Sequence, residues 1–150
     1  NIGLILRPTS PFRNIKNIEK GYSIFKKKNA SSMRAICYAP ATPYKMWKFV
    51  SENQISPLLN HPKIYESVSS PRQKLPLTYW QNGYVDVIRR NTILEKSSMV
   101  GDVVLGIEID EPVFDIDYPD DVARVAEGLR RLEQGLPLSD EKETDDRHPV

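Results

Sequence analysis

Two acidic side chains, Asp115 and Asp117, are the residues whose type and spacing best suit them to chemistry. They lie in segment 113–121, which reads Val-Phe-Asp-Ile-Asp-Tyr-Pro-Asp-Asp and predicts a short apolar strand leading into a helix. Residues two apart on a strand point the same way, so both carboxylates would face one side. Mg²⁺ is typically held by one or two carboxylates plus substrate phosphates. The alternative is that Asp117 caps the helix, with Pro119 in its first turn; the two roles are compatible.

Polar donors gather in three further segments. Leu6–Arg13 reads Leu-Arg-Pro-Thr-Ser-Pro-Phe-Arg, and its two arginines offer planar donors for carboxylate or phosphate, against the alternative of a proline-braced turn. Ser70–Pro76 reads Ser-Pro-Arg-Gln-Lys-Leu-Pro and is followed by Asn82-Gly83, a density of donors typical of a pocket wall. Lys45 follows Thr42-Pro43-Tyr44 in a turn and by itself is typical of a surface residue.

The elements that would position these residues follow from hydrophobic periodicity. We expect strands at 2–6, 32–39, 84–88 and 102–109, a hairpin of 46–50 with 55–59, and helices at 15–28, 91–96 and 119–134. Ser10 or Asn14 would cap the first helix, and Gly135 would end the last. The first strand, helix and second strand have the spacing of a βαβ unit, which predicts a parallel sheet covered by helices. The first strand reads as buried on both faces.

Composition and charge limit the class of protein. The chain has 150 residues, 39% of them hydrophobic and 27% charged, as in an ordinary globular domain. Residues 1–50 carry a net charge of +9 and residues 101–150 a net charge of −10. A single cysteine excludes an intrachain disulfide and, with no apolar run long enough to cross a bilayer and no secretory segment, predicts a cytoplasmic location without membrane contact. No nucleic-acid-binding pattern is present.

Three motifs in order resemble the acylneuraminate cytidylyltransferase family, which includes the CMP-sialic acid synthetases. They are Leu6–Arg13 for Leu-x-Pro-Thr-Ser-Pro-x-Arg, Pro71–Pro76 with Asn82-Gly83 for Pro-Arg-Gln-x-Leu-Pro and Asn-Gly, and Asp115–Asp117 for a late Asp-Ile-Asp before a helix. The resemblance covers about residues 2–134. It implies a Rossmann-like nucleotidyltransferase fold, a mostly parallel sheet flanked by helices, of which this chain would be the C-terminal portion. Residues 135–150 would form an acidic disordered tail.

The resemblance also implies an activity. CMP would pass from CTP to an N-acylneuraminate or related nonulosonic acid for surface glycan biosynthesis, pyrophosphate would leave, and Mg²⁺ would sit on Asp115 and Asp117. An inserted arm, about residues 43–80, would pair two subunits. Arg72 and Lys45 would then reach the acceptor carboxylate or the pyrophosphate region across the interface. Gln73 and Asn82 would shape the sugar pocket, with Arg7 also contacting substrate.

The chain departs from the family's pattern at three places. Arg7 stands where glutamine is usual, Asp86 where a tyrosine is common, and Met99-Val100 where an aromatic pair is expected. Legionaminic, pseudaminic and 3-deoxy-octulosonic acids therefore join N-acetylneuraminate as candidate acceptors. The family's glycine-rich nucleotide loop is not in the sequence, so we expect this portion alone to be inactive. Alternatives are a catalytically silent dimerising module and a haloacid-dehalogenase-like phosphatase, although Tyr118-Pro119 stands where phosphatases need glycine or threonine.

Overall fold

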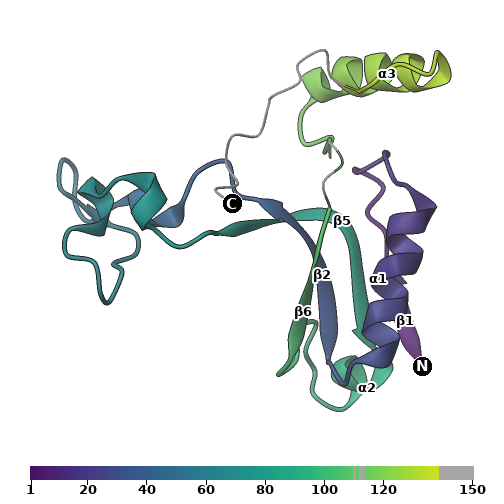
Figure 1. Ribbon diagram of the computed structural model, residues 1–150, viewed down its shortest axis with the longest axis horizontal. Coiled ribbons are helices and arrows are strands. Elements are labelled where there is room, and N and C mark those ends of the chain that lie inside the picture. The colour runs from purple at the N-terminus through teal and green to yellow at the C-terminus, as the bar shows by residue number, and fades with distance from the viewer. Residues whose placement is uncertain (110, 112–113, 139–150) are drawn as a thin grey trace. The chain divides into compact units, whose positions relative to one another are not determined.

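The computed structural model describes residues 1–109, 111 and 114–138. Its helices and strands are β1 (Ile2–Ile5), α1 (Ile15–Lys27), β2 (Ser32–Tyr38), β3 (Trp47–Phe49), β4 (Ile55–Pro57), β5 (Tyr79–Arg89), α2 (Arg90–Leu94), β6 (Val104–Glu108) and α3 (Pro119–Glu133) (Figure 1). The chain divides into two compact units. Unit 1 comprises Asn1–Ala35 and Gly83–Val150, and unit 2 comprises Ile36–Asn82. Each element predicted from periodicity is present among the described residues, within a few positions of its expected ends, except the strand at 113–117.

The sheet of unit 1 has four strands in the order β1-β5-β2-β6. β5 runs antiparallel to β1, with Ile5 opposite Asp86. The N–H of Arg89, at the end of β5, donates to the carbonyl of Ser31, just before β2, so these two strands also run in opposite directions. The N–H of Ser32 donates to the carbonyl of Val103, so β2 and β6 begin at the same end and form the one parallel pair.

The prediction of a mostly parallel, Rossmann-like sheet is therefore wrong. One part of the βαβ prediction is present in the structure: β1, α1 and β2 follow one another, and the two strands run in the same direction. β5, however, lies between β1 and β2 and runs against both. Strand pairing is a long-range property. β5 begins at Tyr79, 41 residues after β2 ends at Tyr38, so its place in the sheet cannot be predicted from the local pattern of β1 and β2.

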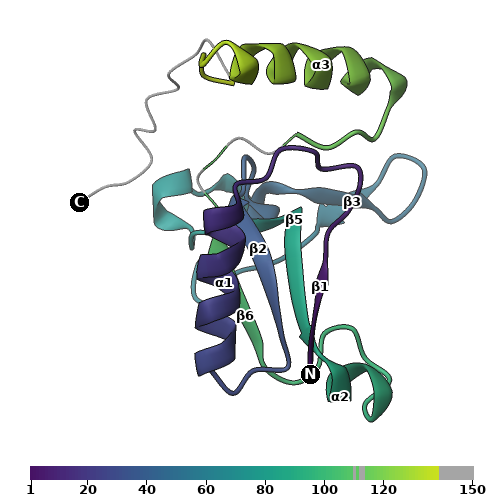
Figure 2. The same cartoon turned by 90° about the vertical axis from the view of Figure 1, so that its right-hand side faces the viewer.

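Helix α1 lies along one face of this sheet (Figure 2). Its N-cap is Asn14, one of the two residues predicted for this position, and the Asn14 side chain accepts the N–H of Lys16 at 3.0 Å. Gly21 allows the helix to approach closely, since a Cβ there would lie 2.8 Å from Met33 Cε. Phe25, fully buried, packs with the apolar side chains of β2, β5 and β6 in one core, formed by Ile18, Phe25, Ala30, Met33, Ala35, Tyr84, Val85, Val87, Ile107 and Ile109.

Two apolar faces differ from the pattern-based expectation. β1 is an edge strand of the described sheet, with Leu4 exposed, and is not buried on both faces. On α3, Val125 and Gly128 are buried, whereas Val122, Leu129 and Leu132, apolar residues at helical spacing, are exposed. In the described sheet β1 is paired only with β5, and α3 meets the ring of Phe12 at Gly128.

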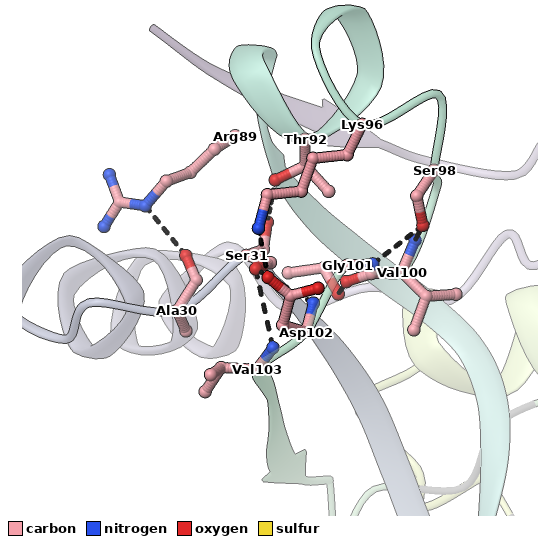
Figure 3. Close-up of polar contacts among 11 residues, drawn as sticks. Ala30, Ser31, Arg89, Thr92, Lys96, Ser98, Val100, Gly101, Asp102 and Val103 are labelled. Carbon is pink, nitrogen blue, oxygen red and sulfur yellow. Dashed lines mark hydrogen bonds and ion pairs between the residues drawn. The ribbon is translucent and has the colours of Figure 1, made fainter.

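A polar loop joins α2 to β6, and Figure 3 shows how it is held. The Oγ of Ser98 accepts the N–H groups of Val100 (3.1 Å) and Gly101 (2.9 Å), and the Oγ of Ser31 accepts the N–H of Asp102 at 3.3 Å. Lys96 pairs with Asp102. Gly101 has φ +74°, and a Cβ there would lie 2.3 Å from Ser31 Cβ. These hydroxyls serve the loop's own backbone, so we assign the cluster a structural role.

Unit 2 contains the predicted hairpin, in which β3 and β4 pair antiparallel. Trp47 faces Pro57, Phe49 faces Ile55, and Lys48 faces Ser56. Residues opposite each other share a face, so one face of the hairpin is apolar and the other polar. The apolar face is open, with Phe49 77% exposed.

Within the part of the chain that the structure describes, no helix is both long enough and apolar enough to cross a lipid bilayer. The predicted acidic tail falls mainly on residues 139–150, which lie outside the described residues.

Candidate functional site

The loop that follows β1 is fixed by Arg13. Its Nε donates to the carbonyl of Tyr84 at 2.7 Å, and one Nη donates to the carbonyl of Arg7 at 2.5 Å. Burial lowers the pKa of the Arg13 guanidinium from its ordinary value, and the neighbouring Tyr84 and Asp115 act in the opposite direction. Arg13 therefore braces the loop against β5, with donors directed at backbone carbonyls within the fold.

The same loop is joined to the segment that carries Asp115. The fully buried Ser10 donates its hydroxyl proton to Asp115 Oδ1. The N–H of Ile116, the residue after Asp115, donates to the carbonyl of Thr9, the residue before Ser10, at 2.9 Å. A hydrogen bond to a charged group contributes about 1.5–3 kcal/mol, so this pair of contacts holds two motifs, 105 residues apart in the chain, side by side.

Gly83, the last residue of the remaining motif, lies beside Ser10 and Asp115. It has φ +69°, a left-handed conformation that strongly favours glycine. A Cβ at this position would lie 3.4 Å from Ser10 Oγ, 3.6 Å from Arg7 Cδ and 3.7 Å from Asp115 Oδ2. Arg7, Ser10, Gly83 and Asp115 thus converge, and we call these four residues the candidate site.

An ion-pair triad adjoins the candidate site. The carboxylate of Asp86 lies 3.6 Å from an Nη of Arg7 and 3.8 Å from Nε of Arg34. Asp86 and Arg34 are nearly buried, whereas half of the Arg7 side chain is exposed. Arg7 and Asp86 are two of the positions at which the chain departs from the cytidylyltransferase pattern, so these two departures are in contact.

A second polar network supports the site from the α1 side. The buried hydroxyl of Tyr84 donates to Glu111 Oε2 at 3.1 Å and accepts the N–H of Asn14. Asn14 also donates its side-chain amide to Glu111 Oε1 at 3.1 Å. Burial raises the pKa of the Tyr84 hydroxyl, so it stays protonated and acts as a donor. The network ties the start of α1 to the strand that carries Gly83 and Asp86.

The aspartate pair differs locally from its prediction. Val113 lies outside the described residues, and residues 114–117 form no strand, so the strand-based reason for both carboxylates facing one way does not apply. Asp115 is half-buried on Ser10, whereas Asp117 is exposed. The capping role of Asp117 is also wrong, because Asp121 accepts the N–H groups of Asp117 (3.0 Å) and Tyr118 (2.9 Å) ahead of α3.

Asp115 and Asp117 provide few ligands for a metal ion. Among the described residues, no group of three or more histidine, cysteine, aspartate or glutamate side chains is arranged to hold a metal ion. Mg²⁺ requires fewer protein ligands, because it keeps several waters and takes its remaining ligands from substrate phosphates. Asp115 Oδ2, on the side of Gly83, and the exposed Asp117 carboxylate are hard oxygen donors, so their chemistry fits this ion.

The other predicted site residues belong to unit 2. Arg72 donates to the carbonyl of Ala39 at 3.1 Å and lies over the ring of Tyr38, 5.2 Å from its centroid, which gives it a structural role. Lys45, at the end of a short 3₁₀ helix, and Gln73 are exposed, and Asn82 is buried. Their predicted substrate contacts stay predictions.

Sequence reasoning predicted Arg7 and Asp115 but missed Ser10, Asp86 and Arg34 as contributors. Ser10 was assigned only as an alternative helix cap, although its place inside the Leu6–Arg13 motif is a usable signal. Asp86 stands in an otherwise apolar strand, Tyr84–Ile88, where a buried charge requires a cationic partner. That requirement predicts a partner but does not identify Arg34.

No known family model matches this chain, and no curated protein sequence is significantly similar to it.

Proposed function

We propose that the chain is part of a nucleotidyltransferase that transfers CMP from CTP to an acidic sugar, an N-acylneuraminate or a related nonulosonic acid. The observation that supports this most is that Ser10, Gly83 and Asp115, one residue from each of three motifs distant in sequence, lie close together. The proposal rests on this site and not on the sheet, because a fold by itself does not define a function.

Transfer of CMP requires mainly that the reactants be positioned and that the charge on the phosphates be neutralised. The anomeric hydroxyl of the sugar attacks the α-phosphorus, a new O–P bond forms, the bond to the β-phosphate breaks, and pyrophosphate leaves while the hydroxyl proton is released. Bound Mg²⁺ would neutralise charge on the phosphates, with Asp115 and Asp117 as its protein ligands. Arg7 supplies a guanidinium suited to a carboxylate or phosphate oxygen, and the positive φ of Gly83 shapes the backbone beside it.

The other proposed contacts come from unit 2. Lys45, Arg72, Gln73 and Asn82 would contact the acceptor sugar or the pyrophosphate region, and Arg72 would need to leave its contact with Ala39 or act through its remaining donors. We further propose that the enzyme acts in the cytoplasm and dimerises through the arm at residues 43–80. The open apolar face of the β3–β4 hairpin supports self-association.

The same apolar face favours a second candidate, a catalytically silent module that dimerises. The two candidates differ in turnover. Pyrophosphate release from CTP should be measured with Mg²⁺ and a panel of N-acetylneuraminic, legionaminic, pseudaminic and 3-deoxy-octulosonic acids, in the chain itself and in the complete gene product that carries it. Release with at least one acid supports the transferase. Dimerisation without release in either protein supports the silent module.

A further inference from the structure

The Arg7–Asp86–Arg34 triad carries more positive charge than its buried carboxylate requires. Asp86 is 7% exposed, and a buried carboxylate without a cation would be strongly unfavourable. Arg34, whose side chain is 13% exposed, already supplies one balancing charge. Arg7 adds a second guanidinium, so the triad has a net charge of +1. That excess charge is on the one member that is half-exposed.

The guanidinium of Arg34 is held by backbone carbonyls. Its two Nη groups donate to the carbonyls of Met33, at 3.3 Å, and Met99. Arg34 therefore holds Asp86, and Asp86 in turn faces Arg7. The 3.6 Å separation between Arg7 and Asp86 is an ion pair that is longer than a hydrogen bond, so it orients the guanidinium without occupying its N–H donors.

The oriented guanidinium belongs to a residue of the candidate site. Arg7 Cδ lies 3.6 Å from the position of a Cβ on Gly83, and the same position is 3.4 Å from Ser10 Oγ. We infer that Arg7 binds an oxyanion of the ligand, a carboxylate or a phosphate, and that Asp86 and Arg34 are positioning residues that aim it. The identity of that ligand, an acidic sugar or CTP, rests on the proposed function.

Binding by the protein, labelled with ¹⁵N at arginine side chains, tests this directly. The probes are N-acetylneuraminate, its uncharged methyl ester and inorganic pyrophosphate, and the readouts are Kd and the Nε–Hε resonance of Arg7. We expect Arg7→Gln to weaken binding of at least one charged probe tenfold or more, and Arg90→Gln, at an exposed arginine of α2, to leave it unchanged. The inference would be overturned if the methyl ester bound as tightly as N-acetylneuraminate and Arg7→Gln bound pyrophosphate as tightly as wild type.

Asp86→Asn separates positioning from simple charge. This variant raises the net charge of the triad by one, so a site that worked by charge alone would bind the anion more tightly. We expect weaker binding and a displaced Arg7 resonance, and tighter binding would overturn the positioning role. If Asp86→Asn does not fold, Arg7→Lys replaces it, since lysine keeps the charge but loses the planar fork; binding equal to wild type would then count against the inference.

The two proposals fail separately. Arg7-dependent pyrophosphate binding in a protein that transfers CMP to none of the acids would support this inference and contradict the proposed function. CMP transfer by a protein whose ligand binding Arg7→Gln does not change would support the proposed function and contradict this inference.

Discussion

Gly83 shows at the scale of one residue why the candidate site needs particular amino acids. Its φ of +69° is strained for any residue with a side chain, and the space beside it is bordered by Ser10, Arg7 and Asp115. Gly135 has the same φ, but nothing lies within 4 Å of where its Cβ would be. The chain thus provides two glycines with equal φ and different surroundings.

Alanine at these two glycines should separate stability from function. We expect Gly83→Ala and Gly135→Ala each to lower the free energy of unfolding by about 1–2 kcal/mol, the cost of a left-handed residue with a side chain. Only Gly83→Ala places a methyl group against the candidate site, so only it should weaken binding of CTP with Mg²⁺. Urea denaturation and calorimetric titration measure both effects. Unchanged CTP binding in Gly83→Ala would show that the ligand does not approach this glycine.

Some of the site was predictable from residue types and some was not. Arg7 and Asp115 belong to motifs whose chemistry can be predicted from their residue types, and both lie at the candidate site. The partnership of Asp86 with Arg34 was not predictable, because it depends on β5 lying beside β2. Asp117 was assigned to a strand by its apolar neighbours, but residues 114–117 make only isolated backbone contacts.

At the scale of elements, the ends of helices followed from local chemistry. Asn14 caps α1 and Gly135 follows α3, as expected, because caps depend on residues close in sequence. The exception is the start of α3, where the carboxylate of Asp121 accepts two backbone N–H groups and Asp117 does not act as the cap. The order of strands, by contrast, depends on contacts between residues distant in sequence, so the antiparallel placement of β5 could not be predicted from local patterns.

Asp121 gives a pH dependence with a definite sign. Hydrogen bonds from the N–H groups of Tyr118 and Asp117, with help from Arg124, lower the pKa of the Asp121 carboxyl from its ordinary value. A carboxyl with a lowered pKa in the folded state stabilises it above the ordinary value near 3.8, and this contribution is lost as pH falls through the folded-state pKa. The Tm difference between wild type and Asp121→Asn should thus be largest near neutral pH and shrink in acid.

Asp120→Asn is the matched control, since Asp120 is in the same first turn of α3. It removes the same charge from the helix N-terminus but not the two backbone contacts of Asp121. An equal Tm loss in both variants at neutral pH would attribute the effect to helix electrostatics alone and contradict the capping role.

At the scale of the whole molecule, the chain consists of two compact units with different surfaces. Unit 1 contains the candidate site and most of the four-stranded sheet, including β2 up to Ala35 and β5 from Gly83. Unit 2 contains the hairpin whose Trp47, Phe49 and Ile55 share an exposed apolar face. The resemblance to the cytidylyltransferase family implied an inserted arm at 43–80, and that range lies within unit 2.

The proposed dimer predicts a face-specific effect of mutation. Phe49→Ser removes an exposed aromatic ring from the apolar face and should weaken self-association tenfold or more in sedimentation equilibrium. Lys48→Ser, on the opposite face of the same strand, should leave it unchanged. Equal association of wild type and Phe49→Ser would place any dimer contact elsewhere.

The most direct test of the proposed function compares two carboxylates three residues apart. In the complete gene product, with CTP, Mg²⁺ and the best acidic sugar, Asp117→Asn should reduce pyrophosphate release by about 100-fold or more, because charge stabilisation by the metal would be lost. Asp120→Asn should retain release near that of wild type. Equal release by wild type and Asp117→Asn would contradict the metal role of the Asp115–Asp117 pair and, with it, the proposed mechanism.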